Sequence, residues 1–204
     1  MAKSAIAAGE RSINKFKTML TGGGARPNLF EVELAFPDIG IQRKTEAELE
    51  SRFMVKAAEL PASNLGDIPV SFRGRILHVP GDRTFDPWTV TVINNTDYSI
   101  RRAFETWSNL INDKASDLGN QTPIDYQKPA TVHQLSRNTG PGTGKTKPGL
   151  TTEIKKIASY NFFGMWPSQI SSIALDYGST DTIEEFQVTF QVEYWTPVYS
   201  DTAE

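Results

Sequence analysis

The chain has 204 residues, with 21 lysines and arginines, 24 aspartates and glutamates, two histidines and no cysteine. Without cysteine it has no disulfide, thiolate metal site or thiol nucleophile, and its net charge of −3 argues against a dedicated nucleic-acid binder. No stretch approaches the roughly 18 consecutive apolar residues of a membrane helix, and the N-terminal stretch contains no apolar core of a secretory signal. We therefore expect a soluble protein of a reducing compartment, without membrane insertion.

Residues 1–25 are polar and end in consecutive glycines, Gly22 to Gly24. Such a run costs too much backbone entropy inside a helix or strand. We expect the segment to form an arm with a short amphipathic helix around Ile13, Phe16 and Leu20, or equally a terminus that is disordered when the protein is alone.

From Leu29 onward, apolar residues alternate with polar ones at a period of two, which is typical of half-buried strands. Phe30 to Phe36 and Trp88 to Val92 show this pattern, and Phe186 to Tyr194 is the clearest example. Further strands are expected at 52–59, 68–79, 126–135, 153–166 and 170–177. Within 68–79, Gly74 indicates a bulge or a close backbone approach. Short strands separated by turn residues predict a sandwich or a barrel.

Between residues 98 and 112 the apolar residues recur at helical spacing, namely Ile100, Ala103, Phe104, Trp107, Leu110 and Ile111. This stripe predicts an amphipathic helix that covers one face or an open end of the β core. Asp97 or Thr96 is suited to cap the N-terminus of this helix.

Two segments are expected to be mobile surface loops between strands: the charged stretch 38–52, and the stretch 137–152, which is rich in Gly, Pro and Thr. Within the second, Gly140 to Thr146 looks like the phosphate-binding loop of an ATPase. It is one residue short, because Thr139 stands where the motif requires its first glycine. It also leads into Lys147-Pro148-Gly149, which cannot open the helix that such a loop needs. A flexible loop is the better interpretation.

No pattern nominates an enzyme active site. His78 and His133 each lie on an expected strand, without a second histidine or a carboxylate at metal-ligand spacing. No serine lies in a nucleophile elbow, although a triad of residues distant in sequence is left open. Arginines gather in the middle of the chain, but the aromatic residues near them alternate inward and do not offer nucleic acid a stacking platform. We expect no catalytic residue, no cofactor and no metal.

Several unusual strings follow one another along the chain: 25–33 (ARPNLFEVE), 60–61 (LP), 68–75 (IPVSFRGR), 79–95 (VPGDRTFDPWTVTVINN), 126–130 (YQKPA), 164–167 (GMWP) and 184–195 (EEFQVTFQVEYW). In this order they closely resemble the tail tube proteins of contractile-tailed bacteriophages. The resemblance covers about residues 25–196 with two interruptions, and the GDRTFDPW block is its most specific part.

The resemblance implies a mainly β fold, in which two packed, mostly antiparallel sheets form a small barrel or sandwich with one flanking helix at about 98–112. The same architecture occurs in the inner tubes of type VI secretion systems. It implies one β domain at 26–196, with loop insertions at about 38–52 and 137–152. An N-terminal arm (1–25) precedes this domain and a C-terminal tail (197–204) follows it.

The resemblance also implies a structural role in the virion. Six copies form a ring, rings stack into a hollow tube inside a contractile sheath, and DNA passes through the lumen to the host. The expected partners are further copies of the chain, the tail sheath, the baseplate and the tail-terminator proteins. The tape-measure protein and the transiting DNA occupy the lumen without specific binding. Assembly is expected in the host bacterial cytoplasm, and no enzymatic activity is expected.

A conduit for DNA should not bind DNA, so polar or acidic side chains suit its inner wall. Candidates lie on the polar sides of two expected strands: Glu185, Gln187, Thr189, Gln191, Glu193, Thr89 and Thr91. Ordinary exposure on the outside is the alternative. The candidate contacts between subunits are Trp107, Phe104, Arg73, Arg75 and Arg83.

Two other functions stay open. The chain is also compatible with the inner tube of a phage-derived contractile injection or secretion system that carries protein. A carbohydrate-binding β-sandwich on the tail is the weaker alternative, because such a protein exposes an aromatic platform whereas most aromatic residues here alternate inward.

Overall fold

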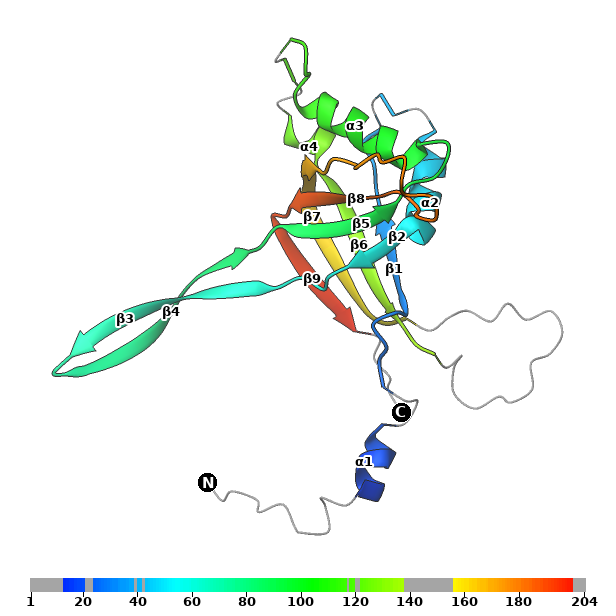
Figure 1. Cartoon of the computed structure of the whole chain (residues 1–204). Helices are drawn as coiled ribbons and strands as arrows, with labels where there is room; N and C mark the ends of the chain where they lie inside the picture. The colour runs from blue at the N-terminus through cyan, green and yellow to red at the C-terminus, as the bar shows by residue number, and fades with distance from the viewer. Residues whose placement is uncertain are drawn as a thin grey trace.

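The computed structural model describes residues 13–20, 24–38, 40–41, 43–116, 118–119, 122–137 and 156–199. The helices are α1 (Ile13–Met19), α2 (Lys44–Met54), α3 (Ser99–Ile111) and α4 (Pro123–Tyr126). The strands are β1 (Phe30–Leu34), β2 (Val55–Ala58), β3 (Ser63–Phe72), β4 (Arg75–Phe85), β5 (Trp88–Ile93), β6 (Lys128–Leu135), β7 (Lys156–Ile170), β8 (Glu185–Gln191) and β9 (Tyr194–Tyr199). Figure 1 shows a β body that carries α2 and α3, with the β3–β4 hairpin projecting far from it. No helix of this described part is long and apolar enough to cross a membrane.

The body is a 7-stranded sheet with the order β1-β6-β7-β8-β5-β2, in which β9 also pairs with β7 and every pairing is antiparallel. The long strand β7 belongs to both halves of this sheet. Its first part pairs with β6 and β9, and its last part, from Trp166, pairs with β8. The two halves pack over a shared core, as expected, but β1 and β2 at the ends of the order do not pair, so the sheet is not closed into a barrel.

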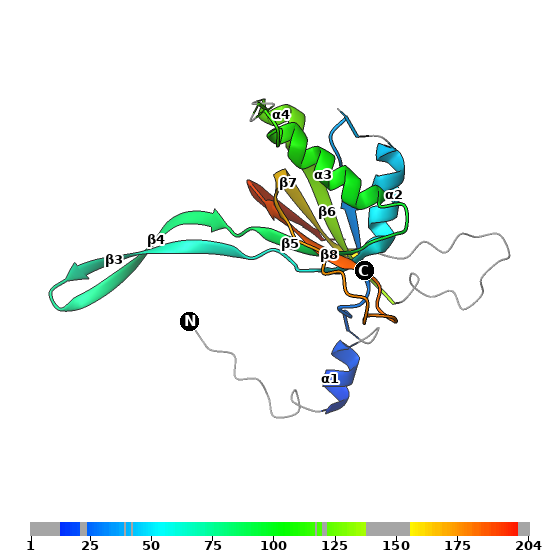
Figure 2. The ribbon, with the colours of Figure 1, turned by 45° about the horizontal axis from the view of Figure 1, so that its top comes forward.

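The core lies where the alternating residues of the sheet meet α3. In β5 and β8 every second residue is buried, and the register places Val90 opposite Val188. The Trp88 ring stacks on Phe162 of β7 with 4.5 Å between ring centroids, which joins the two halves. The apolar stripe of α3 is buried against this core, as its spacing predicts. Figure 2 shows α3 and α2 beside each other on the body.

The stretch 38–52 is not a loop, because most of it belongs to α2. Its buried residues are Ala47 and Ser51, which lie one helical turn apart, while Glu46 and Arg52 are exposed and Glu48 and Glu50 are half-buried. Small buried residues give almost no hydrophobic periodicity, so the charge run concealed the helix.

The strand expected at 68–79 is in fact the β3–β4 hairpin. The chain reverses at Arg73 and Gly74, whose φ angles of 47° and 80° are those of a type I′ turn. Gly74 is therefore a turn residue and not a bulge. The irregular register lies further back, between Leu65 and Asp67.

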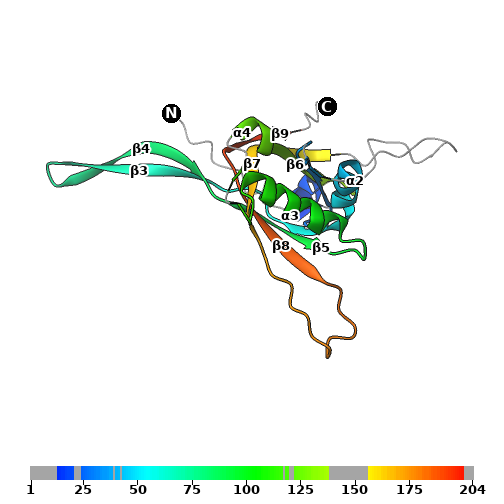
Figure 3. The ribbon, with the colours of Figure 1, turned by 90° about the horizontal axis from the view of Figure 1, so that it is seen from above.

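Two smaller expectations also change, and a third falls outside the described residues. The segment 171–184 contains no strand, since β7 ends at Ile170, and it projects from the body between β7 and β8 (Figure 3). Tyr98, not Asp97 or Thr96, precedes α3, and the Asn95 side-chain oxygen accepts the Ser99 N–H at 3.3 Å. The Gly140–Thr146 motif and most of the 137–152 stretch lie outside the described residues.

The structure describes parts of the expected N-terminal arm (1–25) and of the expected C-terminal tail (197–204). Residues 13–19 form a helix, at the position expected within the N-terminal arm. Strand β9 extends to Tyr199, which pairs with Ala158, so the first residues of the expected tail belong to the sheet.

Candidate assembly surfaces

The β3–β4 hairpin has one apolar face and an opposite face, here called the polar face, on which polar side chains alternate with Pro69, Ile76 and Pro80. Paired residues of antiparallel strands point to the same face and successive residues to opposite faces, so the register assigns each side chain. One face carries exposed apolar side chains from both strands, namely Ile68, Val70, Phe72, Leu77 and Val79. On the opposite face, the His78 ring Nδ1 lies 2.6 Å from a carboxylate oxygen of Asp67. Phe72 and Leu77 keep 66% and 63% of their surface exposed, so the described part of the chain leaves the apolar face uncovered.

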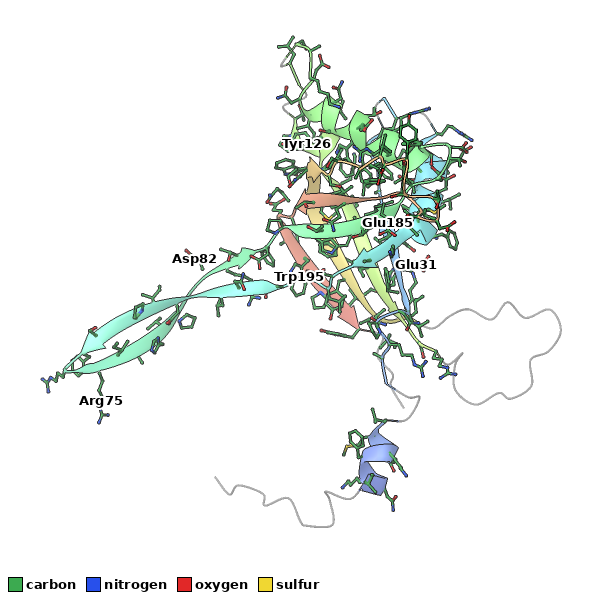
Figure 4. All side chains as sticks on the ribbon, viewed as in Figure 1. Glu31, Arg75, Asp82, Tyr126, Glu185 and Trp195 are labelled. Atoms are coloured by element: carbon green, nitrogen blue, oxygen red, sulfur yellow. The ribbon has the colours of Figure 1, made fainter. Side chains whose placement is uncertain are left out.

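The tip of the hairpin is basic. Arg73 and Arg75 flank the turn, and the Arg73 guanidinium carbon lies 5.2 Å from the centre of the Phe72 ring. Arg83 lies nearer the body, where its guanidinium donates a hydrogen bond to the Ser63 hydroxyl at 3.1 Å. Figure 4 shows Arg75 at the far end of the hairpin and Asp82 between the tip and the body.

The root of the hairpin is fixed to the body by two indole rings. The Trp88 indole N–H donates to the Glu59 carbonyl at 2.8 Å, and the Trp195 indole N–H donates to the Ala62 carbonyl at 3.2 Å. Phe85, the last residue of β4, meets the Trp195 ring edge to face at 6.2 Å. The hairpin therefore leaves the body in a defined direction.

A polar face runs across the paired strands β5 and β8. The Thr89 and Thr189 hydroxyls lie 3.1 Å apart, and Thr91 pairs with Gln187. Glu185 accepts a hydrogen bond from the Lys56 ammonium group of the adjacent strand β2 at 2.5 Å. Figure 4 labels Glu185 on this part of the sheet. The positive charge of Lys56 is therefore balanced within the face.

The comparisons with known families and with known proteins agree with one another. The family model described as phage tail tube protein matches residues 25–197. The chain belongs to the phage tail tube protein family. It is 36% identical to the tail tube protein gp19 of Enterobacteria phage T4 and 35% identical to that of Enterobacteria phage T6. Each alignment spans 175 residues, 86% of this chain and 93% of the relative.

A solved structure shares the fold. A chain from the sheath–tube complex of an extracellular contractile injection system superimposes with a TM-score of 0.57 at 11% identity. The match covers 90% of this chain and 97% of that one.

In this tail tube family member, the sequence-predicted lumen residues lie largely together. Glu185, Gln187, Thr189 and Gln191 alternate along β8 on the side away from the core, and Thr89 and Thr91 continue that side on β5. Glu193 does not share this face. It follows the end of β8, its N–H donates to the Phe163 carbonyl at 3.2 Å, and its side chain lies against Gly164.

The sequence-predicted contact residues fall into two groups. Arg73, Arg75 and Arg83 are exposed on the hairpin. Phe104 and Trp107 are buried inside the chain's own core, with 0% and 1% of their surface exposed. The Trp107 indole N–H donates to the Tyr126 carbonyl at 2.8 Å, which ties α3 to α4.

Sequence reasoning missed a charged cluster around Glu33. One carboxylate oxygen of Glu33 lies 3.5 Å from a nitrogen of Arg52, of His133 and of Lys156. Burial lowers the pKa of His133 below its ordinary value of 6.5, and the nearby Lys156 charge lowers it further, against the opposing effect of Glu33. His133 is therefore neutral at pH 7. These residues come from α2, β1, β6 and β7, so no local pattern could have grouped them.

Nothing in this arrangement forms a metal centre: within the described ranges, no group of three or more His, Asp or Glu side chains is placed to hold an ion.

Proposed function

We propose that six copies of this chain form a ring, and that the rings stack into the hollow inner tube of a contractile phage tail. DNA passes through this tube to the host. One observation carries the proposal: a member of the tail tube family projects a hairpin whose apolar face is left uncovered by the residues that the structure describes.

The hairpin needs a neighbour for its stability. An isolated two-stranded hairpin is marginally stable in water, and a contiguous exposed apolar patch is typical of an interaction site. In a ring or a stack of rings, a neighbouring copy buries this face. A head-to-tail contact that closes by rotation gives a ring, and a second contact along the axis gives a filament.

The polar face of β5 and β8 is proposed to line the lumen. Its threonine, glutamine and glutamate side chains offer DNA no excess positive charge, because Lys56 is paired with Glu185. A wall of this kind lets a polyanion pass without holding it.

The role proposed for the chain is structural, without catalysis and without a cofactor. As a virion component it would contact the tail sheath around it and the baseplate and tail-terminator proteins at its two ends. The tape-measure protein and then the DNA would occupy its lumen. Assembly would take place in the cytoplasm of the host bacterium.

An electron micrograph of the concentrated purified protein tests the assembly. We expect stacked rings or tubes with a central hole. The double variant Val70→Asp/Leu77→Asp places two charges on the apolar face and should leave monomers whose circular dichroism still shows the folded β body. Ser71→Asp adds a charge to the opposite face of the same hairpin and should still assemble. Monomers from the unmodified chain at high concentration, or tubes from the double variant, would contradict the proposal.

A tube that carries protein is the second candidate, because the fold is shared with a chain of an extracellular contractile injection system. The neighbouring genes distinguish the two. Genes for a capsid and a DNA-packaging motor support the phage tail, and their absence supports the injection device.

A further inference from the structure

The described part of the chain has a second uncovered apolar surface, on helix α1. Ile13, Phe16 and Met19 recur at helical spacing, and they keep 68%, 60% and 73% of their surface exposed. Leu20, directly after the helix, continues the same stripe and is also exposed. Lys15 and Lys17 lie on either side of the stripe.

A helix of this kind needs a surface to pack on. Helices shorter than about 12 residues are marginal in water, and α1 has 7 residues. Helical stability in proteins comes mainly from packing an amphipathic face. The stripe of α1 therefore requires an apolar partner of similar size.

The apolar face of the β3–β4 hairpin matches the stripe in size. Ile13–Met19 spans about 10 Å at the rise of an α-helix. The hairpin face from Ile68 to Phe72 spans about 13 Å at the rise of a strand. Both surfaces are uncovered, both are built from aliphatic side chains with one phenylalanine, and each is too small to be stable alone.

Charge orients the contact. The charged side chains of α1 are both lysines. Toward the body the hairpin carries Asp82 and, on its opposite face, Asp67, against the single positive charge of Arg83, whereas its tip carries Arg73 and Arg75. Opposite charges attract and like charges repel at these separations, so α1 fits over the half of the apolar face that lies nearer the body.

The two surfaces do not meet within one chain. Figures 1 and 2 show α1 below the body and well apart from the hairpin, which projects sideways. The segment from Leu20 to Phe30 spans at most about 36 Å when extended, which limits how far α1 lies from the start of β1. We propose that α1 of one copy packs on the apolar face of the β3–β4 hairpin of a neighbouring copy. This inference rests on the proposed assembly.

Cysteine cross-linking tests it directly, because the chain has no cysteine of its own. Phe16→Cys is made in a tagged chain and Val70→Cys in an untagged chain. The two are co-assembled and treated with a short bis-maleimide. We expect a cross-linked heterodimer of tagged and untagged chains in the tubes, at about tenfold the yield of the controls, because packing raises the local concentration of the partner thiol.

Matched controls use the same elements but the opposite faces. Asn14→Cys lies on the far side of α1 and Ser71→Cys on the polar face of the hairpin, so neither should cross-link efficiently. Met19→Cys with Leu77→Cys provides a second pair should the first reduce assembly. Tubes that form without the heterodimer in either pair overturn the inference and leave the tube intact. An unmodified chain that forms no tubes overturns the proposed function and this inference with it.

Discussion

Gly164 lies in β7 where the strand passes from one half of the sheet to the other. Its φ of +64° belongs to the left-handed region, and a Cβ there would lie 2.7 Å from the Cβ of Glu193 and 2.5 Å from its carboxylate oxygen. Both the backbone conformation and this close approach require glycine.

We therefore expect Gly164→Ala to lower the free energy of unfolding by about 2 kcal/mol or more, since it combines backbone strain with a clash. Urea denaturation at neutral pH, under conditions that keep the protein monomeric, measures the loss. Gly74→Ala is the matched control, because Gly74 has a φ of +80° but nothing within 4 Å of the added Cβ. Equal losses for the two variants would show that the approach of Glu193 is unimportant.

His133 should make the stability of the protein depend on pH. Its folded-state pKa lies below 6.5 because burial penalises the imidazolium. The unfolded chain therefore binds a proton at a higher pH than the folded chain does. The stability due to neutral His133 is fully present above about pH 6.5 and is lost as the pH falls through the folded-state pKa.

The substitution His133→Gln tests this effect while keeping a polar side chain beside Ser159 and Glu33. Between about pH 7.5 and pH 5.5 the urea midpoint of the parent should fall more than that of the variant. Parallel decreases would mean that His133 does not contribute. The charged groups that face the ring are Glu31 and Glu33 on β1 and Lys156 on β7.

Which single residues are buried was largely predictable from the sequence. Which side chains of distant elements contact one another was not. The alternation around Val90 and Val188 gave the correct buried side because a strand has only two faces. The contacts of Glu33 with Arg52, His133 and Lys156 depend on how distant elements are brought together, which no local period records.

At the scale of elements, helix α3 was predictable from the sequence and helix α2 was not, because the two helices bury side chains of different size. α3 buries large residues, including Phe104 and Trp107, so its stripe stands out against a polar background. α2 buries only Ala47 and Ser51. The hairpin was misjudged because apolar residues continue on both sides of Arg73-Gly74, a pair less typical of a type I′ turn than Asn-Gly.

Substitutions of Trp107 distinguish a role of α3 in the stability of the fold from a role in contacts between subunits. Because its ring is fully buried, Trp107→Ala should lower the free energy of unfolding by about 3–5 kcal/mol. Trp107→Phe keeps most of the packing but leaves the Tyr126 carbonyl unpaired, and should cost about 1–3 kcal/mol. Thermal and urea denaturation measure both. A Trp107→Ala monomer of normal stability that cannot assemble would assign the residue to a subunit contact instead.

At the scale of the whole molecule, the polar face of β5 and β8 should control how tubes interact with DNA. Gln187→Lys/Gln191→Lys adds two charges to this face and keeps the Lys56–Glu185 pair. Tubes of this variant should bind DNA in a salt-dependent manner, whereas the parent should not. Thr45→Lys/Leu49→Lys adds the same charge on α2, and serves as the control. Equal DNA affinity of both variants would place the lumen elsewhere.

The sharing of β7 by both halves of the sheet determines how the body comes apart. Because one strand pairs with β6 and β9 up to Met165 and with β8 from Trp166 onward, we expect neither half to melt without breaking the other. Amide hydrogens of β6 and β8 should therefore exchange with solvent through the same global opening, with equal free energies, while those of α1 exchange much sooner. In the proposed stack of rings, a load applied to a subunit would then be carried by a single cooperative unit.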